Sequence, residues 1–148
     1  MKNLTPFLLA LFITNSAIAQ ISPDQFYTPV NTGSNMTLGV NTDDLDDFIG
    51  GSLAAFNADG TCIGIEIIQN QFFSMAIWGN DTGTPEIDGL QDGEIATFAV
   101  LSQGGRVITI AELANFNGYV TNSVVVTNAI TLSGCTNDEF LEFHTQGY

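Results

Sequence analysis

The feature that most constrains the fold is a series of short apolar runs, separated by turn signals, between residues 50 and 101. Two of these runs, Leu53 to Phe56 and Thr61 to Ile68, flank the pair Asp59-Gly60. An Asp-Gly step between apolar runs is a strong hairpin signal, because glycine adopts positive φ without strain. We therefore predict two antiparallel strands joined by a tight turn.

Isoleucines recur at every second position within the second run. Side chains of a strand point alternately to opposite faces, so a period of two places such residues together. We expect one face of this strand to carry Ile63, Ile65 and Ile67, and the other to carry Cys62, Gly64 and Glu66.

Further apolar or alternating runs predict the remaining strands. They cover residues 35–41, 72–78, 94–101 and 106–111, and residues 119–132 as one long or two short strands. Residues 42–48 combine a candidate N-cap with four acidic residues, which suits one helical turn or a tight loop. The chain is therefore predicted to be all-β, a two-sheet antiparallel β-sandwich of jelly-roll or immunoglobulin-like type with at most one short helical turn.

The first residues have the composition of a secretory signal peptide. Lys2 supplies a positive start, Phe7 to Ile13 an apolar segment and Ala17-Ile18-Ala19 a cleavage site, so we expect residues 1–19 to be removed. The apolar segment is far shorter than the ~20 residues of a membrane-spanning helix. The mature chain is expected to be secreted or at the cell surface, without membrane insertion. Its expected parts are an N-terminal arm (20–32), one β-sandwich domain that stands alone (33–134) and a C-terminal tail (135–148).

Acidic residues dominate the charge of the chain. It has 16 Asp and Glu against 2 Lys and Arg, and loss of Lys2 with the signal peptide changes the formal net charge from −14 to −15. Such a surface repels nucleic-acid phosphates and anionic lipid headgroups, so we expect neither as a partner. The charge either provides solubility or indicates that divalent cations are part of the working state.

Two cysteines, Cys62 and Cys135, are present in a chain that is expected to be exported. Oxidation is the default outside the cell, so we predict one disulfide between them. Closure of so long a loop stabilises by roughly 4 to 5 kcal/mol in the chain-entropy model. The alternative is two separate buried thiols, while a metal or redox role is disfavoured because the C-x-x-C spacing is absent.

The segment from Gly79 to Gly93 is rich in glycine and carboxylates. Ca²⁺ prefers six to eight hard oxygen ligands, and glycines permit the sharp turns that coordination demands. The candidate calcium ligands in and next to this loop are Asp81, Asp88, Asp92 and Glu94. An equally favoured interpretation is that these side chains cap turns by accepting hydrogen bonds from backbone N–H groups.

Catalytic groups are scarce. His144 is the only histidine, and the chain has neither a G-x-S-x-G nucleophile motif nor a helical zinc-binding histidine pair, so we expect no enzyme. Glu66 and Glu94 are the carboxylates that a glycoside hydrolase would use. Trp78 is a candidate sugar-stacking platform, with packing in the core as the alternative.

Several short segments occur in an order that extends over nearly the whole mature chain. They are Pro29-Val30, residues 32–37, 55–56, 59–64, 78–81, 84, 88–90, 93–94, Phe98, Tyr119 and residues 122–125. In this order they resemble a module found in exported and cell-surface proteins of Bacteroidota-type bacteria. The resemblance implies a β-sandwich and no settled biochemical activity.

Together these patterns predict a secreted, non-catalytic structural or adhesive subunit that self-assembles into extracellular filaments or matrix and is stabilised by calcium. Its expected partner is a second copy, or a component of the cell surface or matrix. The arm or the tail would add a strand to a neighbour, with cations screening the charge between copies. The alternative is a glycan-binding module that uses Trp78, and a glycoside hydrolase is the least favoured class.

Overall fold

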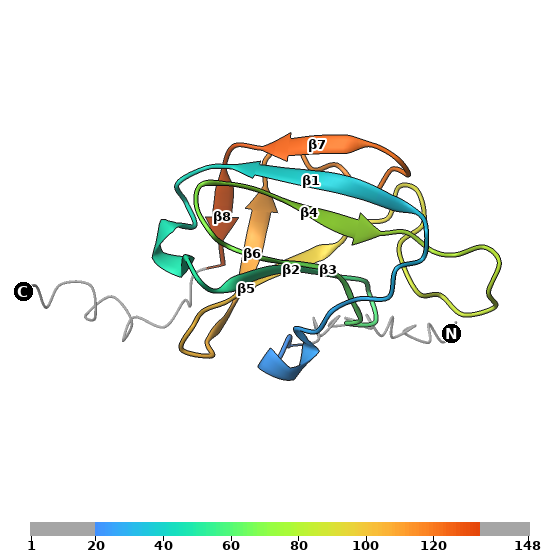
Figure 1. Ribbon diagram of the computed structural model, residues 1–148, viewed down its shortest axis with the longest axis horizontal. Coiled ribbons are helices and arrows are strands. Elements are labelled where there is room, and N and C mark those ends of the chain that lie inside the picture. The colour runs from blue at the N-terminus through green and yellow to red at the C-terminus, as the bar shows by residue number, and fades with distance from the viewer. Residues whose placement is uncertain (1–19, 134–148) are drawn as a thin grey trace, which may run out of the picture.

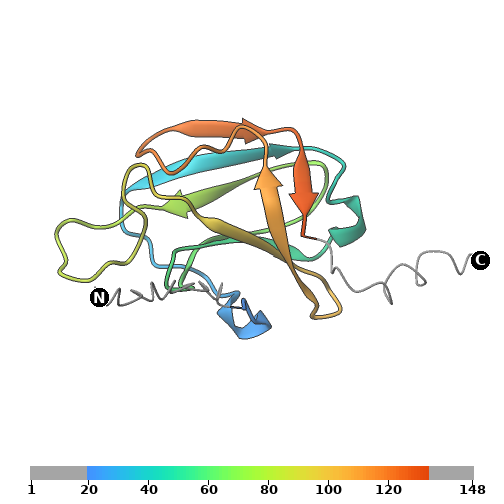
Figure 2. The same cartoon turned by 180° about the vertical axis from the view of Figure 1, so that it is seen from behind.

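The computed structural model describes residues 20–133, which form two facing β-sheets (Figure 1). One sheet has three strands in the order β4-β1-β7, and the other has five in the order β3-β2-β5-β6-β8. Figure 2 shows the same two layers from behind. The strands are β1 (Asn35–Asn41), β2 (Ser52–Phe56), β3 (Cys62–Ile67), β4 (Phe72–Trp78), β5 (Thr97–Leu101), β6 (Val107–Leu113), β7 (Val124–Thr127) and β8 (Ile130–Leu132). The predicted all-β, two-sheet architecture is confirmed.

Two details of the architecture differ from the expectation. The described residues contain two 3-10 turns, η1 (Pro23–Gln25) and η2 (Asp46–Phe48), where the sequence analysis expected at most one. η1 is preorganised by a proline at its start and by a capping box, in which the Ser22 N–H donates to Oε1 of Gln25 at 2.8 Å. The second difference is that β7 pairs with β1 in parallel, whereas all other strand pairs are antiparallel.

The predicted hairpin between β2 and β3 is present, but its side-chain register differs from the expectation. Oδ1 of Asn57 accepts hydrogen bonds from the N–H groups of Asp59 and Thr61, and Gly60 has a φ of 79°. Ala55 pairs with Gly64 while Phe56 pairs with Cys62, so Ile63 is an extra residue in β3.

This β-bulge reverses the alternation along β3. Ile63 packs in the core between the sheets, whereas Ile65 packs on the outer face of its sheet together with Cys62. The expectation that Ile63 and Ile65 share a face is therefore wrong.

The main core lies between the sheets and contains alternate residues of nearly every strand. Met36 and Leu38 of β1, Ile77 of β4 and Val100 of β5 are fully buried. The edges β3 and β4 of the two sheets also lie close together. A Cβ atom at Gly64 would come within 2.6 Å of the carbonyl oxygen of Ala76, so glycine is required for this approach.

A second apolar cluster lies on the outer face of the five-stranded sheet, where the N-terminal arm covers it. Ile21 and Phe26 of the arm pack against residues of β2, β3 and β5, and the Phe26 and Phe56 rings meet edge to face with centroids 5.3 Å apart. The side-chain amide of Gln25 donates to the carbonyl of Gly60 at 2.8 Å. The arm is therefore docked on its own domain.

Candidate functional site

Within residues 20–133, no segment covers the outer face of the three-stranded sheet in this way. Outward positions of this sheet include Phe72 and Ala76 on β4, Thr37 on β1, and Val124 and Val126 on β7. Phe72 is 65%, Val124 70% and Val126 51% exposed. Exposure of this extent shows that residues 20–133 leave the face uncovered, and it makes the face a candidate contact surface.

This open face is also uncharged. β1, β4 and β7 read NMTLGVN, FFSMAIW and VVVT, without an acidic or basic residue in any of them. The five-stranded sheet, by contrast, carries Glu66 and Glu112. In a chain with a formal net charge of −14, an uncharged sheet is the surface on which another molecule of the same chain meets the least repulsion.

Side chains occupy several of the sheet edges. The Asn115 amide donates to the carbonyl of Val126 on β7 at 3.2 Å, and the N–H of Ile130 on β8 donates to Oδ2 of Asp44 at 2.7 Å. The N–H of Cys62 on β3 donates to the hydroxyl of Tyr27 at 3.3 Å. Natural proteins block edges in this way to prevent strand-to-strand association. The open surface is therefore a sheet face rather than a sheet edge.

The predicted calcium loop begins and ends at a narrow neck. Gly79 forms an isolated bridge with Leu90, and the Asn80 N–H donates to the Leu90 carbonyl at 2.8 Å. Across the neck, Oδ1 of Asn80 accepts from the Asp88 N–H at 3.1 Å, and Oδ1 of Asp88 accepts from the Asp81 N–H at 2.9 Å. Asp81 and Asp88 are thus brought together, and both act as turn caps, since Asp81 Oδ1 also accepts from the Gly83 N–H.

The other two predicted calcium ligands lie in different turns. Oδ1 of Asp92 accepts from the N–H and the hydroxyl of Thr121, at 2.8 and 3.0 Å. Oε2 of Glu94 accepts from the N–H of Gln91 at 2.8 Å. Within residues 20–133, no three Asp, Glu, His or Cys side chains gather into a group that could hold a metal ion. The hydrogen bonds follow the turn-capping alternative, and calcium binding stays a prediction.

Cys62 carries a buried thiol beneath the arm, and its Sγ lies 3.5 Å from the Gly64 carbonyl oxygen. Burial raises the pKa of this thiol, because the low-dielectric surroundings disfavour the thiolate. Cys135, its predicted disulfide partner, lies outside the described residues. The disulfide therefore stays a prediction.

The remaining predicted site residues do not converge. Trp78 is half-buried at the end of β4 on the open face, and it belongs to neither apolar cluster of the described residues. Oε1 of Glu66 accepts from the N–H of Ile67, so Glu66 and Glu94 each cap a local backbone group. His144 lies outside the described residues.

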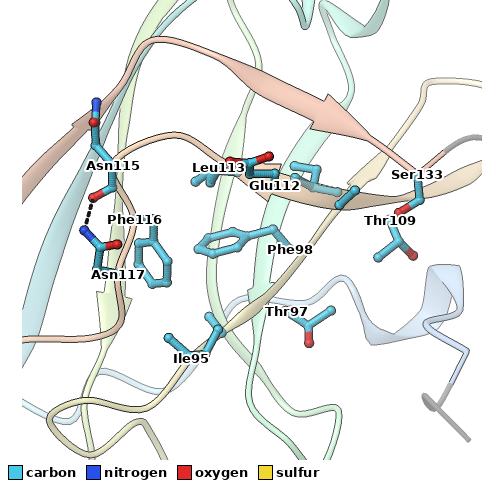
Figure 3. A pocket seen from close by; sticks show the side chains of 13 residues that line it. Ile95, Thr97, Phe98, Thr109, Glu112, Leu113, Asn115, Phe116, Asn117 and Ser133 are labelled. Carbon is cyan, nitrogen blue, oxygen red and sulfur yellow. Dashed lines mark hydrogen bonds between the residues drawn. The ribbon is translucent and has the colours of Figure 1, made fainter.

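The sequence analysis missed a pocket at the fork between β5 and β6. These strands pair only from Ala99 opposite Thr109 to Leu101 opposite Val107, after which β6 turns away to pair with β8. An open cleft of about 510 Å³ lies at the fork. Figure 3 shows the side chains that line it. No local motif marks it, because it arises from the divergence of two strands that each look regular in sequence.

Comparisons of the chain with protein-family models, with curated proteins and with solved structures find no match. The resemblance to an exported module of Bacteroidota-type bacteria therefore stays a prediction. Among residues 20–133, no helix has the length and apolar character needed to cross a membrane.

Proposed function

We propose that the chain is a secreted, non-catalytic structural or adhesive subunit, and that its copies associate through the open face of the three-stranded sheet. The observation that carries this proposal is the combination of apolar exposure and absence of charge on β1, β4 and β7. The centres of protein interfaces are depleted of charged residues in the same way. Export rests on the predicted signal peptide over residues 1–19.

Face-to-face contact fits this surface better than strand donation by the arm. Ile21 and Phe26 are packed on the five-stranded sheet, so release of the arm to a neighbour would expose the apolar cluster beneath it. A sheet face on each of two copies forms a two-fold interface, which closes as a dimer. Growth into filaments or matrix then requires a second contact elsewhere on each copy.

The small area of the open face limits the affinity that a contact through it is expected to reach. A seven-residue strand spans about 23 Å, and three strands span about 14 Å, so the flat area is roughly 300 Å². Stable interfaces bury about 800 Å² per partner, so a single face-to-face contact is expected to be weak. Repulsion between acidic copies weakens it further at low salt, and salt or divalent cations relieve that repulsion.

Sedimentation velocity on the full secreted chain tests the proposal. We expect monomer at about 10 μM and dimer at about 1 mM, with more dimer at high salt. Val126→Glu places a carboxylate on the open face, where burial against a like-charged copy is costly, so this variant should stay monomeric. Val126 is half-exposed, so the fold itself should lose little stability.

Ile67→Glu is the matched control. Ile67 lies on β3 in the other sheet and is 54% exposed, so the variant adds the same charge to an equally exposed strand position. We expect Ile67→Glu to dimerise like the wild type. A wild-type chain that stays monomeric at all concentrations and salts, or equal loss of dimer in both variants, would refute the proposal.

A further inference from the structure

The fork between β5 and β6 combines an aromatic middle with polar ends. Figure 3 shows Phe98 and Phe116 at its centre, with Asn115 and Asn117 toward one side of the view and Thr109 and Ser133 toward the other. The two rings meet edge to face, with centroids 4.9 Å apart and planes at 86°. Phe98 is 4% exposed and belongs to the core, whereas Phe116 is half-buried and lines the opening.

Several polar groups around the pocket are available to a ligand. Within residues 20–133, the hydroxyls of Thr97 and Thr109 and the carboxylate of Glu112 make no side-chain hydrogen bond. Asn117 donates only a long bond of 3.5 Å, to the Asn115 carbonyl, and its side-chain oxygen remains free to accept. A cleft lined by apolar side chains with a few polar groups is the usual form of a small-molecule site, and 510 Å³ lies in the usual range of volumes.

The charge of the fork restricts the class of ligand. Glu112 is the only ionisable side chain among the residues that line it, so no cation there would bind a phosphate, sulfate or carboxylate. The net negative charge of the chain also repels anions. A neutral ligand with an apolar surface and many hydroxyls satisfies both the aromatic centre and the polar ends.

We propose that the fork binds a neutral oligosaccharide, with the C–H face of one sugar ring against Phe116 and sugar hydroxyls bonded to Asn117, Thr97 and Glu112. The proposed role is binding and not cleavage, because most glycoside hydrolases act with two carboxylates and the lining supplies one. It is distinct from Trp78, which lies on the open face of the other sheet. The proposal does not depend on self-association.

NMR titration of the full chain with neutral tetrasaccharides tests the proposal. The probes are tetramers of β-1,4-glucose, α-1,4-glucose, β-1,4-xylose and β-1,4-N-acetylglucosamine, with tetragalacturonate as the anionic comparison. We expect at least one neutral tetramer to shift the side-chain amide signals of Asn115 and Asn117, and tetragalacturonate to shift neither. The titration uses the Val126→Glu variant at low concentration, so failure of self-association and failure of saccharide binding are read separately.

Two conservative variants locate the site. Asn117→Ala and Thr97→Val each remove one hydrogen-bonding group from a half-buried or exposed position, so the fold should persist, and each should weaken binding about 3- to 10-fold. Trp78→Ala is the control and should bind like the parent chain. Absence of binding to every neutral tetramer would refute the proposal, and so would binding that Trp78→Ala abolishes while Asn117→Ala leaves it unchanged.

Discussion

Within residues 20–133, the outer face of one sheet is covered and the outer face of the other is exposed. The five-stranded sheet presents Phe56 and Cys62 outward, and both are almost fully buried because Ile21 and Phe26 of the arm lie over them. The three-stranded sheet presents Phe72, Val124 and Val126 outward, and all of them are more than half exposed. Both faces carry apolar side chains at outward positions, yet only one has a cover within residues 20–133.

Within residues 20–133, the outer face of the five-stranded sheet is covered by the arm, whereas the outer face of the three-stranded sheet is exposed to solvent. The arm is held by a capping box, by the Gln25 bond to Gly60 and by aromatic packing, which are the features of a permanent contact. The open face combines exposed apolar side chains with a lack of charge, and no segment within residues 20–133 packs over it. If copies pair through it and the fork binds saccharide as proposed, each pair carries two such sites, and two linked sites bind a surface more tightly than one.

The disulfide has the largest expected effect, and it concerns the covered face, where Cys62 lies beneath the arm. We predict that the chain, purified without reductant and then denatured, takes up no iodoacetamide until it is reduced. Reduction should then lower the free energy of unfolding by roughly 4 to 5 kcal/mol. Intact mass after alkylation checks the pairing with Cys135. Two alkyl groups on the unreduced chain would show two separate thiols, which is the alternative to the disulfide given in the sequence analysis.

A pair of phenylalanine variants tests the two faces directly. Phe26→Ala removes half-buried packing from the covered face and should cost about 2 to 4 kcal/mol. Phe72→Ala removes a side chain that is 65% exposed from the open face and should cost less than about 0.5 kcal/mol. Urea denaturation of monomeric protein measures both. Equal costs would mean that the open face is covered in the free chain as well.

Asp44 links the two sheets, and its carboxyl group makes the stability of this link depend on pH. It follows β1 of the three-stranded sheet and accepts a hydrogen bond from Ile130 of the five-stranded sheet. The N–H of Ile130, followed by the Thr42 hydroxyl, holds the pKa of Asp44 below its usual value.

A carboxyl with a lowered pKa in the folded state stabilises above its unfolded pKa of about 3.9, and this contribution is lost as the pH falls through the folded pKa. Thermal melts between about pH 6 and pH 2 should therefore show a smaller acid-induced decrease for Asp44→Asn than for the wild type. Because Asp44 is exposed, solvent screening keeps the difference small. Identical pH profiles would show that the contact contributes nothing.

Two variants of Asp88 separate turn capping from calcium binding in the loop that connects β4 to β5. Asp88→Asn keeps the oxygen that accepts from the Asp81 N–H but removes the charge, whereas Asp88→Ala removes both. If capping is the role of Asp88, Asp88→Ala loses about 1 kcal/mol, Asp88→Asn loses little, and neither change alters the response to calcium. If Asp88 binds Ca²⁺, millimolar calcium raises the Tm of the wild type, and both variants lose that rise.

The sequence predicts much of the fold, because strand alternation and turn chemistry are local. The strands 35–41 and 72–78 and the Asp59-Gly60 turn follow from side-chain period and positive φ alone. The bulge at Ile63 cannot be predicted from the local sequence, because it depends on how β3 pairs with β2. The arm reads as irregular because its order comes from Phe26 packing on Phe56, a contact that no local pattern encodes.

The sites are less predictable than the fold, since they depend on which strands become neighbours. Val124 and Val126 look like ordinary strand residues until β7 pairs with β1 and faces outward. The fork at Phe98 and Phe116 requires β6 to leave β5 for β8. Asp81, Asp88, Asp92 and Glu94 are close in sequence, but only Asp81 and Asp88 share a hydrogen bond, while Asp92 and Glu94 cap other turns.

The most direct test of the open-face proposal is a methyl NMR concentration series on the full chain. We predict that the methyl signals of Val124, Val126 and Ala76 move as the concentration rises from about 10 μM to about 1 mM, and that the shifts grow with salt. Ile67 lies on β3 and Ile95 lies just before β5, and both are more than half exposed. Their signals should stay in place. Shifts at Ile67 or Ile95 without shifts at Val124 and Val126, or no shifts at all, would contradict association through the uncharged face.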